Sequence, residues 1–222
     1  MKPSRNSLLL AIVLSALASL AQEEKQSAPP EAKPAQQTEP AAPSEYAALL
    51  AKVKAGDLSI DFQRLRFSYM ESPERKAAKD TSAEKTQMWE AFKAQDYKKA
   101  IENAETVVAQ EFVDMDGHYV AAASYREMQD LERAELQRKI FIGLLDSIRN
   151  SGDGKSLETA YVVIETHEEY VILGGMGLQP HKQSLVRKDG HTYDVLEAMD
   201  QKNGQPVTLY FNVDIPFKHY LQ

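Results

Sequence analysis

A short pattern that recurs at an offset of 34 residues (from 96 to 130) most constrains the fold of this chain. Residues 96–100 (DYKKA) reappear as residues 130–134 (DLERA). Each copy begins with an Asp that can cap a helix and holds an Ala where a neighbouring helix must approach closely. Helical hydrophobic patterns precede the two copies, over residues 83–94 and 115–128. The sequence therefore predicts two helical hairpins in tandem.

These two hairpins resemble the tetratricopeptide repeat, a 34-residue unit of two antiparallel helices. In the second unit, Ala122 and Tyr125 occupy the positions of that family's small residue and tyrosine. Met88 and Ala91 stand there in the first unit, and neither unit ends with the consensus proline. The resemblance covers residues 83–149, under a third of the chain.

The candidate binding residues lie on the first helix of each unit. In a tetratricopeptide-like pair these helices line a concave surface, and alignment of the two units places four side chains on it: Lys85, Trp89, Tyr119 and Arg126. An aromatic anchor beside a cation is typical of a groove that binds a protein or peptide partner. Core packing is the alternative interpretation of Trp89, because a lone Trp is usually largely buried.

Helices are also predicted on both sides of the two units. An apolar face over residues 46–53 predicts a helix that Gly56 stops, and Asp61 can cap the next helix. The polar segment 72–82 is expected to be a loop or a frayed connection. The last helix carries its apolar stripe over residues 141–148.

Strand patterns replace helical ones after residue 154. Residues 181–187 and 191–199 flank Asp189-Gly190, a dipeptide typical of a hairpin turn. Residues 207–213 alternate between apolar and polar side chains, as in a half-buried strand. Residues 161–164 form a short β-rich run.

The segment before this hairpin is ambiguous. Residues 170–173 are apolar and suit a strand or a helix, and the glycines at 174, 175 and 177 are expected to break them. The predicted fold class is α+β. N-terminal antiparallel helices at 45–150 precede a small antiparallel β-sheet at 155–222, within a single domain at 45–222.

The N-terminus predicts export. Residues 1–21 have a positive end, an apolar run of signal-peptide length and small residues at the cleavage site. Residues 22–44 contain five prolines and no aromatic side chain. This composition predicts a disordered linker. The chain has no Cys, so no lipid anchor can follow cleavage. We expect a periplasmic or secreted protein with no membrane span after cleavage.

The excess of acidic residues bears on which class of macromolecule the protein binds. The chain has 26 Lys+Arg and 33 Asp+Glu, a formal net charge of -7. Nucleic-acid binding needs clustered basic residues, so the acidic balance argues against it. We expect a protein or peptide partner in the cell envelope.

Four blocks in order resemble a bacterial family catalogued as Domain of Unknown Function 4919. They are residues 56–69 (GDLSIDFQRLRFSY), 138–148 (RKIFIGLLDSI), 151–163 (SGDGKSLETAYVV) and 209–216 (LYFNVDIP). The family has no assigned activity, so the resemblance implies one domain and names no reaction. Inside the first two blocks, Arg66 and Arg138 are candidates for structural ion pairs with Asp61 or Asp146.

The turn at Gly152–Ser156 is the alternative candidate site, through Asp153, Lys155 and Ser156. It fails as a phosphate-binding P-loop because Arg149 stands where the first Gly is required. It also lacks the alternating ligands of a calcium loop. A glycine C-cap followed by a tight turn is the favoured interpretation, and a contact to an anion or metal is the alternative.

Catalytic constellations are not apparent in the sequence. The five histidines form no H-E-x-x-H motif, and residues 167–169 (HEE) are expected to be a solvated acidic turn. We predict no catalytic residues, no metal ligands and no cofactor. The leading hypothesis is a non-catalytic interaction module, and the alternative is an exported hydrolase-like or small-ligand-binding domain that uses the 152–156 turn.

Overall fold

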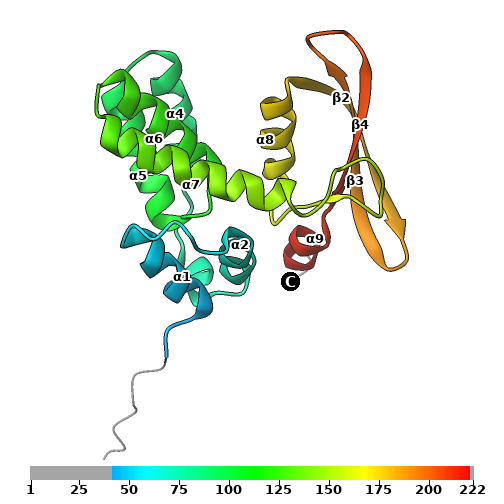
Figure 1. The fold of residues 1–222 in the computed structure, drawn as a ribbon, viewed down its shortest axis with the longest axis horizontal. Coiled ribbons are helices and arrows are strands. Elements are labelled where there is room, and N and C mark those ends of the chain that lie inside the picture. Colours follow the sequence, from blue (N-terminus) through cyan, green and yellow to red (C-terminus); the bar gives the residue numbers. More distant parts are fainter. Residues whose placement is uncertain (1–41, 221–222) are drawn as a thin grey trace, which may run out of the picture. The chain divides into compact units, whose positions relative to one another are not determined.

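The computed structural model describes residues 42–220, which form nine helices and four strands (Figure 1). The helices α1 to α7 come first: α1 (Glu45–Lys54), α2 (Phe62–Met70), α3 (Pro73–Ala77), α4 (Ser82–Lys93), α5 (Tyr97–Gln110), α6 (Met115–Glu127) and α7 (Leu131–Arg149). The second half contains β1 (Tyr161–Val162), α8 (His167–Met176), β2 (Leu178–Lys188), β3 (His191–Asp200), β4 (Pro206–Asn212) and α9 (Asp214–Tyr220). The predicted leader at 1–21 and most of the linker at 22–44 lie outside the described residues. Across residues 42–220, no helix combines the length and apolar character that a membrane crossing needs.

Short polar side chains start several helices by accepting a hydrogen bond from a backbone N–H group. These caps are Ser44 for α1, Asp61 for α2, Asp96 for α5, Asp114 for α6 and Asp130 for α7. Ser72 caps α3 in the same way, and Pro73 occupies its first turn. The prediction of a loop over residues 72–82 is therefore wrong for α3. A serine cap followed by proline favours a helical turn even in a polar segment.

The two helical hairpins α4–α5 and α6–α7 contain the same turn. Gln95 and Gln129 join the helices, with φ angles of 60° and 62°. Asp96 and Asp130 follow, and their side chains accept backbone N–H groups three residues ahead at 3.2 and 3.1 Å. The backbone N–H of each Asp donates to a carbonyl five residues earlier, at 2.9 Å in both turns. The 34-residue recurrence thus corresponds to one turn that is built twice.

The strands form one sheet in the order β1-β4-β3-β2. The α+β prediction is confirmed, with helices first and the sheet second. Strands β2, β3 and β4 pair antiparallel, whereas the short β1 pairs with β4 in parallel. The sheet is mixed because β1 and β4 are separated by α8 and two strands, a connection long enough to allow parallel pairing. Asp189 and Gly190, with φ angles of 52° and 83°, form the predicted hairpin turn.

The helix α8 contradicts two predictions. Residues 167–169 lie in its first turn rather than in a solvated acidic turn, and Glu168 and Glu169 are only 6% and 0% exposed. The helix also continues through Gly174 and Gly175 to Met176, and Gly177 caps it with a φ of 71°. Two acidic residues on its buried face hide the hydrophobic period that would otherwise have identified it as a helix.

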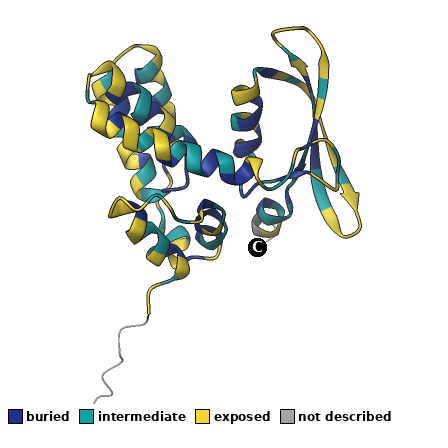
Figure 2. Cartoon of the chain, viewed as in Figure 1, coloured by how far each residue is buried: buried dark blue, intermediate teal, exposed yellow. Residues whose placement is uncertain are grey.

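Two hydrophobic clusters fill the interior (Figure 2). The larger joins α1, α2, α7 and α8 to the sheet, and Leu65, Leu144 and Phe211 within it are fully buried. The smaller lies inside the two helical hairpins, where Ala100 and Ala104 let the helices approach closely. The helical half and the sheet thus contribute side chains to the same core.

A buried ion pair crosses the larger cluster. The Arg66 side chain is 0% exposed and donates from Nε to Glu168 Oε1 at 3.0 Å. Its Nη2 also bonds Glu168, and its Nη1 donates to Ser147 Oγ at 3.1 Å. Glu168 Oε2 in turn accepts the Ile164 backbone N–H at 2.8 Å. This network ties α2, α7 and the segment after β1 to α8.

The ion-pair partners predicted for Arg66 and Arg138 are wrong. Arg66 pairs with a glutamate of α8 rather than with Asp61 or Asp146. Arg138 pairs with Glu135, one turn earlier on α7, at 2.7 Å. The α8 partner lies 102 residues away in sequence, a separation at which charge spacing carries no information about contact.

Candidate functional site

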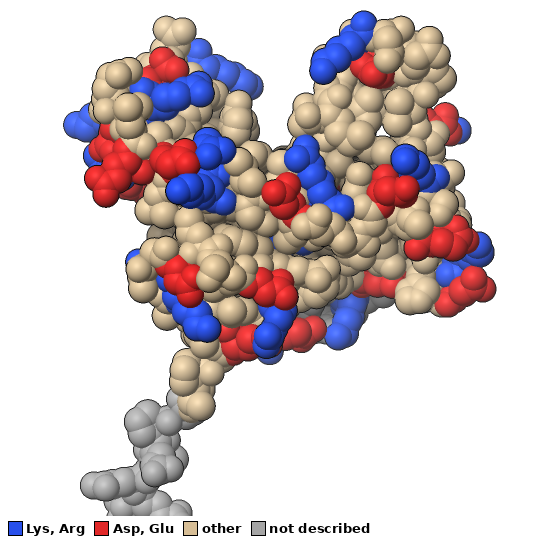
Figure 3. All heavy atoms as spheres, viewed as in Figure 1, with Lys and Arg blue, Asp and Glu red and all other residues tan. Residues whose placement is uncertain are grey.

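A groove of about 620 Å³ lies among α4, α6, α7 and α8. Figure 3 shows the surface hollowed between the helical hairpins and α8, with acidic and basic side chains interspersed over this face. The lining is mainly apolar or aromatic and contains Trp89, Tyr119, Phe141, Leu145, Tyr170, Val171, Gly174 and Gly175. Three charged or titratable side chains complete it: Asp116, Arg149 and His167.

A row of aromatic rings forms one wall of this groove. The Trp89 and Tyr119 ring centroids lie 6.1 Å apart, and those of Tyr119 and Phe141 lie 5.7 Å apart. Trp89 and Phe141 are half-buried, whereas Tyr119 is 44% exposed. Trp89 therefore contributes to the edge of the smaller core cluster and also presents a face to the groove.

Helix spacing explains which side chains of α7 and α8 reach the groove. On α7, Phe141, Leu145 and Arg149 follow each other at four-residue intervals and share one face. On α8, residues 167, 170–171 and 174–175 follow the same rule. The opposite face of α8 carries the buried side chains of Glu168, Glu169, Ile172 and Leu173.

Hydrogen bonds to the Asp116 carboxylate join three helices at the rim of the groove. The Trp89 indole N–H donates to Asp116 Oδ2 at 3.2 Å, and His167 Nε2 lies 2.8 Å from the same oxygen. The hydrogen bond to Asp116 raises the pKa of His167 above its ordinary value. Asp116 thus links α4 and α6 to the first turn of α8.

A second hollow, of about 580 Å³, lies next to the groove between α6 and α7. Both hollows are lined by Tyr119 and Phe141. Arg126, Glu135 and Arg138 provide charges along the second hollow. Glu135 is engaged by Arg138, whereas the Arg126 side chain is 70% exposed.

The structure brings three of the four predicted groove residues to this surface. Trp89 and Tyr119 line the first hollow together, and Tyr119 and Arg126 line the second. Lys85 lies elsewhere: its Nζ pairs with Glu111 at 3.0 Å and with Asp114 at 2.7 Å. Burial lowers the pKa of Lys85, but the two carboxylates outweigh burial and raise it overall. Lys85 is therefore occupied by structural ion pairs.

Sequence reasoning missed the residues of the groove that lie on α7 and α8. Phe141, Arg149 and Tyr170 come from helices outside the two aligned first helices, so the repeat alignment could not include them. The spacing Phe141–Leu145–Arg149 was a readable signal for one helix face. That this face of α7 lies opposite Trp89 could be learned only from the tertiary structure.

The alternative site, the turn at 152–156, is a loop between α7 and β1 in which Asp153 and Lys155 are exposed and Gly154 is buried. The Asp153 carboxylate accepts the Lys155 backbone N–H at 3.0 Å and the Thr159 hydroxyl at 2.6 Å. The Ser156 hydroxyl lies 3.2 Å from that of Thr159, and the Lys155 side chain is 80% exposed. A Cβ at Gly154 would lie 2.4 Å from the Tyr161 ring, so close packing accounts for that glycine. The polar groups of this turn bond to one another.

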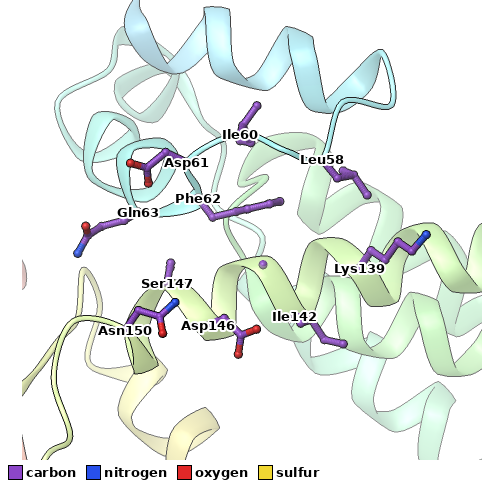
Figure 4. A pocket seen from close by; sticks show the side chains of 11 residues that line it. Leu58, Ile60, Asp61, Phe62, Gln63, Lys139, Ile142, Asp146, Ser147 and Asn150 are labelled. Atoms are coloured by element: carbon purple, nitrogen blue, oxygen red, sulfur yellow. The ribbon is translucent and has the colours of Figure 1, made fainter.

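A third hollow, of about 560 Å³, lies between α2 and another face of α7 (Figure 4). Phe62 packs directly on Gly143, where a Cβ would lie 2.5 Å from the ring. Asp61 and Asp146 stand on its rim and point away from each other (Figure 4). Because Asp61 already caps α2, the hollow lacks a convergent set of free polar groups.

Two histidines outside the groove, His118 and His191, are engaged individually. His118 is buried between Gln137 and the Phe112 carbonyl, and burial lowers its pKa. His191 Nδ1 lies 2.5 Å from Asp214 Oδ2 on the surface. Among residues 42–220, no group of three or more His, Asp and Glu side chains is arranged to hold a metal ion.

A comparison with protein-family models identifies the family. Residues 39–222 match the model described as Domain of unknown function (DUF4919). The chain belongs to this family. No curated protein and no solved structure matches this DUF4919 chain.

In this DUF4919 protein, the four sequence blocks meet in pairs. The first block contacts the second through Phe62 on Gly143 and through the Arg66–Ser147 hydrogen bond. The third contacts the fourth where β1 pairs with β4 and the Tyr161 and Phe211 rings lie 5.7 Å apart. The blocks therefore build the scaffold that holds α7 and the sheet.

Proposed function

We propose that this DUF4919 protein is an exported bacterial interaction module whose groove among α4, α6, α7 and α8 binds a peptide segment of a partner protein. The observation that carries the proposal is the row of contacting rings of Trp89, Tyr119 and Phe141 along that groove. Aromatic side chains on rigid helices lose little conformational freedom on binding, and they dominate the energy of many interfaces.

Two glycines of α8 support a ligand whose backbone comes close to the helix. A Cβ at Gly174 would meet no heavy atom within 4 Å, and one at Gly175 would meet only the Arg149 side chain, at 3.6 Å. Glycine inside a helix costs about 0.5–1 kcal/mol relative to alanine. Internal packing does not explain this cost at Gly174, whereas close approach of a peptide backbone does.

The export part of the proposal rests on the sequence. The charged and apolar pattern of residues 1–21 suits a secretory leader, and the proline-rich segment after it suits a tether. A chain without Cys is unaffected by an oxidising compartment. The partner is accordingly expected in the cell envelope.

Truncation of the exposed aromatic residue tests the groove. We expect Tyr119→Ala to weaken capture of a saturable envelope partner by about tenfold or more, since interface aromatics often contribute 2 kcal/mol or more. Immobilised protein would be titrated with envelope extract and the captured species quantified by mass spectrometry. Leu185→Ala is the matched control, because Leu185 is 48% exposed on β2, outside the groove lining. Equal loss in both variants, or no saturable capture by the parent protein, contradicts the proposal.

Gly174→Ala separates stability from binding. We expect the free energy of unfolding of this variant to be about 0.5–1 kcal/mol higher than that of the parent. Alanine is favoured over glycine inside a helix, and the added methyl group meets no neighbour. The same methyl group should weaken partner capture because it projects into the groove. Urea unfolding and the capture titration measure the two effects. A stabilised variant with unchanged capture would remove α8 from the binding surface.

A further inference from the structure

We infer that the groove selects an acidic segment, and that Arg149 binds a carboxylate side chain of that segment next to the aromatic row. This inference rests on the proposed function and names the chemistry of the partner. Arg149 ends the α7 row that begins with Phe141 and Leu145. Its Nη2 lies 3.6 Å from the position that a Cβ of Gly175 would take, so the guanidinium lies along α8 at the groove.

Charge within the groove favours an anionic ligand. Asp116, the acidic side chain of the first hollow, already accepts the Trp89 N–H and bonds His167. Arg149 has a single ion pair among the described residues, with Asp146 at 3.7 Å, and both side chains are about half exposed (43% and 51%). A pair of that length in solvent contributes little, so the planar guanidinium remains available for bidentate binding to a carboxylate.

The second hollow repeats this arrangement at its far side. Arg126 lies there with a 70% exposed side chain and one 3.7 Å pair to its neighbour Glu127. Arg138 is committed to Glu135 at 2.7 and 2.9 Å. Two weakly paired arginines therefore flank a shared aromatic centre at Tyr119 and Phe141, on a protein with a net charge of -7.

This placement favours acidic side chains within a segment over a chain terminus. The two hollows lie on either side of the aromatic centre and share Tyr119 and Phe141, so a ligand that occupies both can carry charges on both sides of an apolar residue. The partner chemistry is thus an extended peptide with Glu or Asp on either side of an aromatic or large aliphatic residue.

Four pools of short synthetic peptides test the inference. Each peptide is about eight residues long, is amidated at the C-terminus and lacks Trp. The central residue is Phe or Ser, the flanking residues are both Glu or both Gln, and the remaining positions vary among Ala, Gly, Ser and Thr. The emission of Trp89, the only tryptophan of the chain, reports occupancy of the groove in the full-length protein.

We expect the Phe/Glu pool to bind about tenfold more tightly than the Phe/Gln pool, because a charge-assisted bidentate contact is lost with Gln. Arg149→Gln should remove most of this preference. Lys139→Gln, which removes a cation of the same helix that faces the third hollow, should retain it. The preference should also shrink as salt rises from about 50 to about 500 mM.

Three outcomes overturn the inference while leaving the proposed function intact. They are equal binding of the Phe/Glu and Phe/Gln pools, an unchanged Glu preference in Arg149→Gln, and tight binding of a fifth, control pool, the Phe/Gln peptides with a free C-terminal carboxylate, where the amidated Phe/Gln pool binds weakly. Failure of the proposed function has a different signature, since the Phe pools would then bind no better than the Ser pools.

Discussion

Replacing Arg66 with methionine should lower the free energy of unfolding by about 3–5 kcal/mol, because the change leaves the buried carboxylate of Glu168 without its cation. Both side chains are almost fully buried, and the guanidinium also bonds Ser147. The loss of the cation would leave Glu168 one described hydrogen bond, from the Ile164 N–H at 2.8 Å. Urea unfolding followed by circular dichroism measures the change.

Two further variants determine whether the loss comes from an uncompensated charge. Arg66→Met combined with Glu168→Gln removes both charges and keeps an acceptor for the Ile164 N–H, so it should recover most of the lost stability. Arg64→Met, two residues earlier on α2, removes an exposed arginine paired with Glu45 and should cost less than about 1 kcal/mol. A double variant no more stable than Arg66→Met would show that packing of the arginine, rather than its charge, explains the loss.

Local signals predicted much of the helical half and the hairpin. The Asp caps at 96 and 130 lie in turns with the same φ angles and hydrogen bonds, so a recurrence in sequence indicated a recurrence in structure. Asp189-Gly190 gave the turn between β2 and β3 for the same reason, because both residues readily adopt positive φ. These features depend on a few neighbouring residues, which a sequence displays directly.

The helix α8 and the groove could not be predicted in this way. The buried face of α8 carries Glu168, whose burial is tolerated because Arg66 reaches it from a position 102 residues earlier. Because the sequence does not show this contact, residues 167–169 (HEE) are predicted to be a solvated turn. Since α8 forms one wall of the groove, its misassignment also concealed Tyr170 and the position of Arg149.

A second buried carboxyl of α8, Glu169, should make the stability of the protein fall as pH rises. Its side chain is 0% exposed, and neither oxygen has a hydrogen-bond partner among the described residues. Burial, with smaller contributions from Asp194 and Glu168, raises the pKa of Glu169 to about 8 from an ordinary 4.5. Asp194 is also buried, which raises its pKa, and it accepts a 2.6 Å hydrogen bond from Gln183.

The folded and the unfolded chain release the Glu169 proton over different pH ranges, and this difference makes stability fall as pH rises. Below pH 4.5 the Glu169 carboxyl is protonated in both the folded and the unfolded chain, so its raised pKa costs nothing. Between pH 4.5 and about 8 the unfolded chain releases this proton while the folded chain retains it, and stability falls by up to about 1.4 kcal/mol per pH unit. Above about pH 8 the full cost is present.

Glu169→Gln should therefore be more stable than the parent by about 2–4 kcal/mol at about pH 8.5, and by less than about 1 kcal/mol at about pH 4.5. The comparison uses urea unfolding across this range, and the difference between the two proteins isolates Glu169 from the other titrating groups. Glu90→Gln, at an exposed position of α4, should show no such pH-dependent difference. Parallel pH profiles for Glu169→Gln and the parent would mean that the folded protein ionises Glu169 near its ordinary pKa, through solvent access or a movement of α8 away from Asp194.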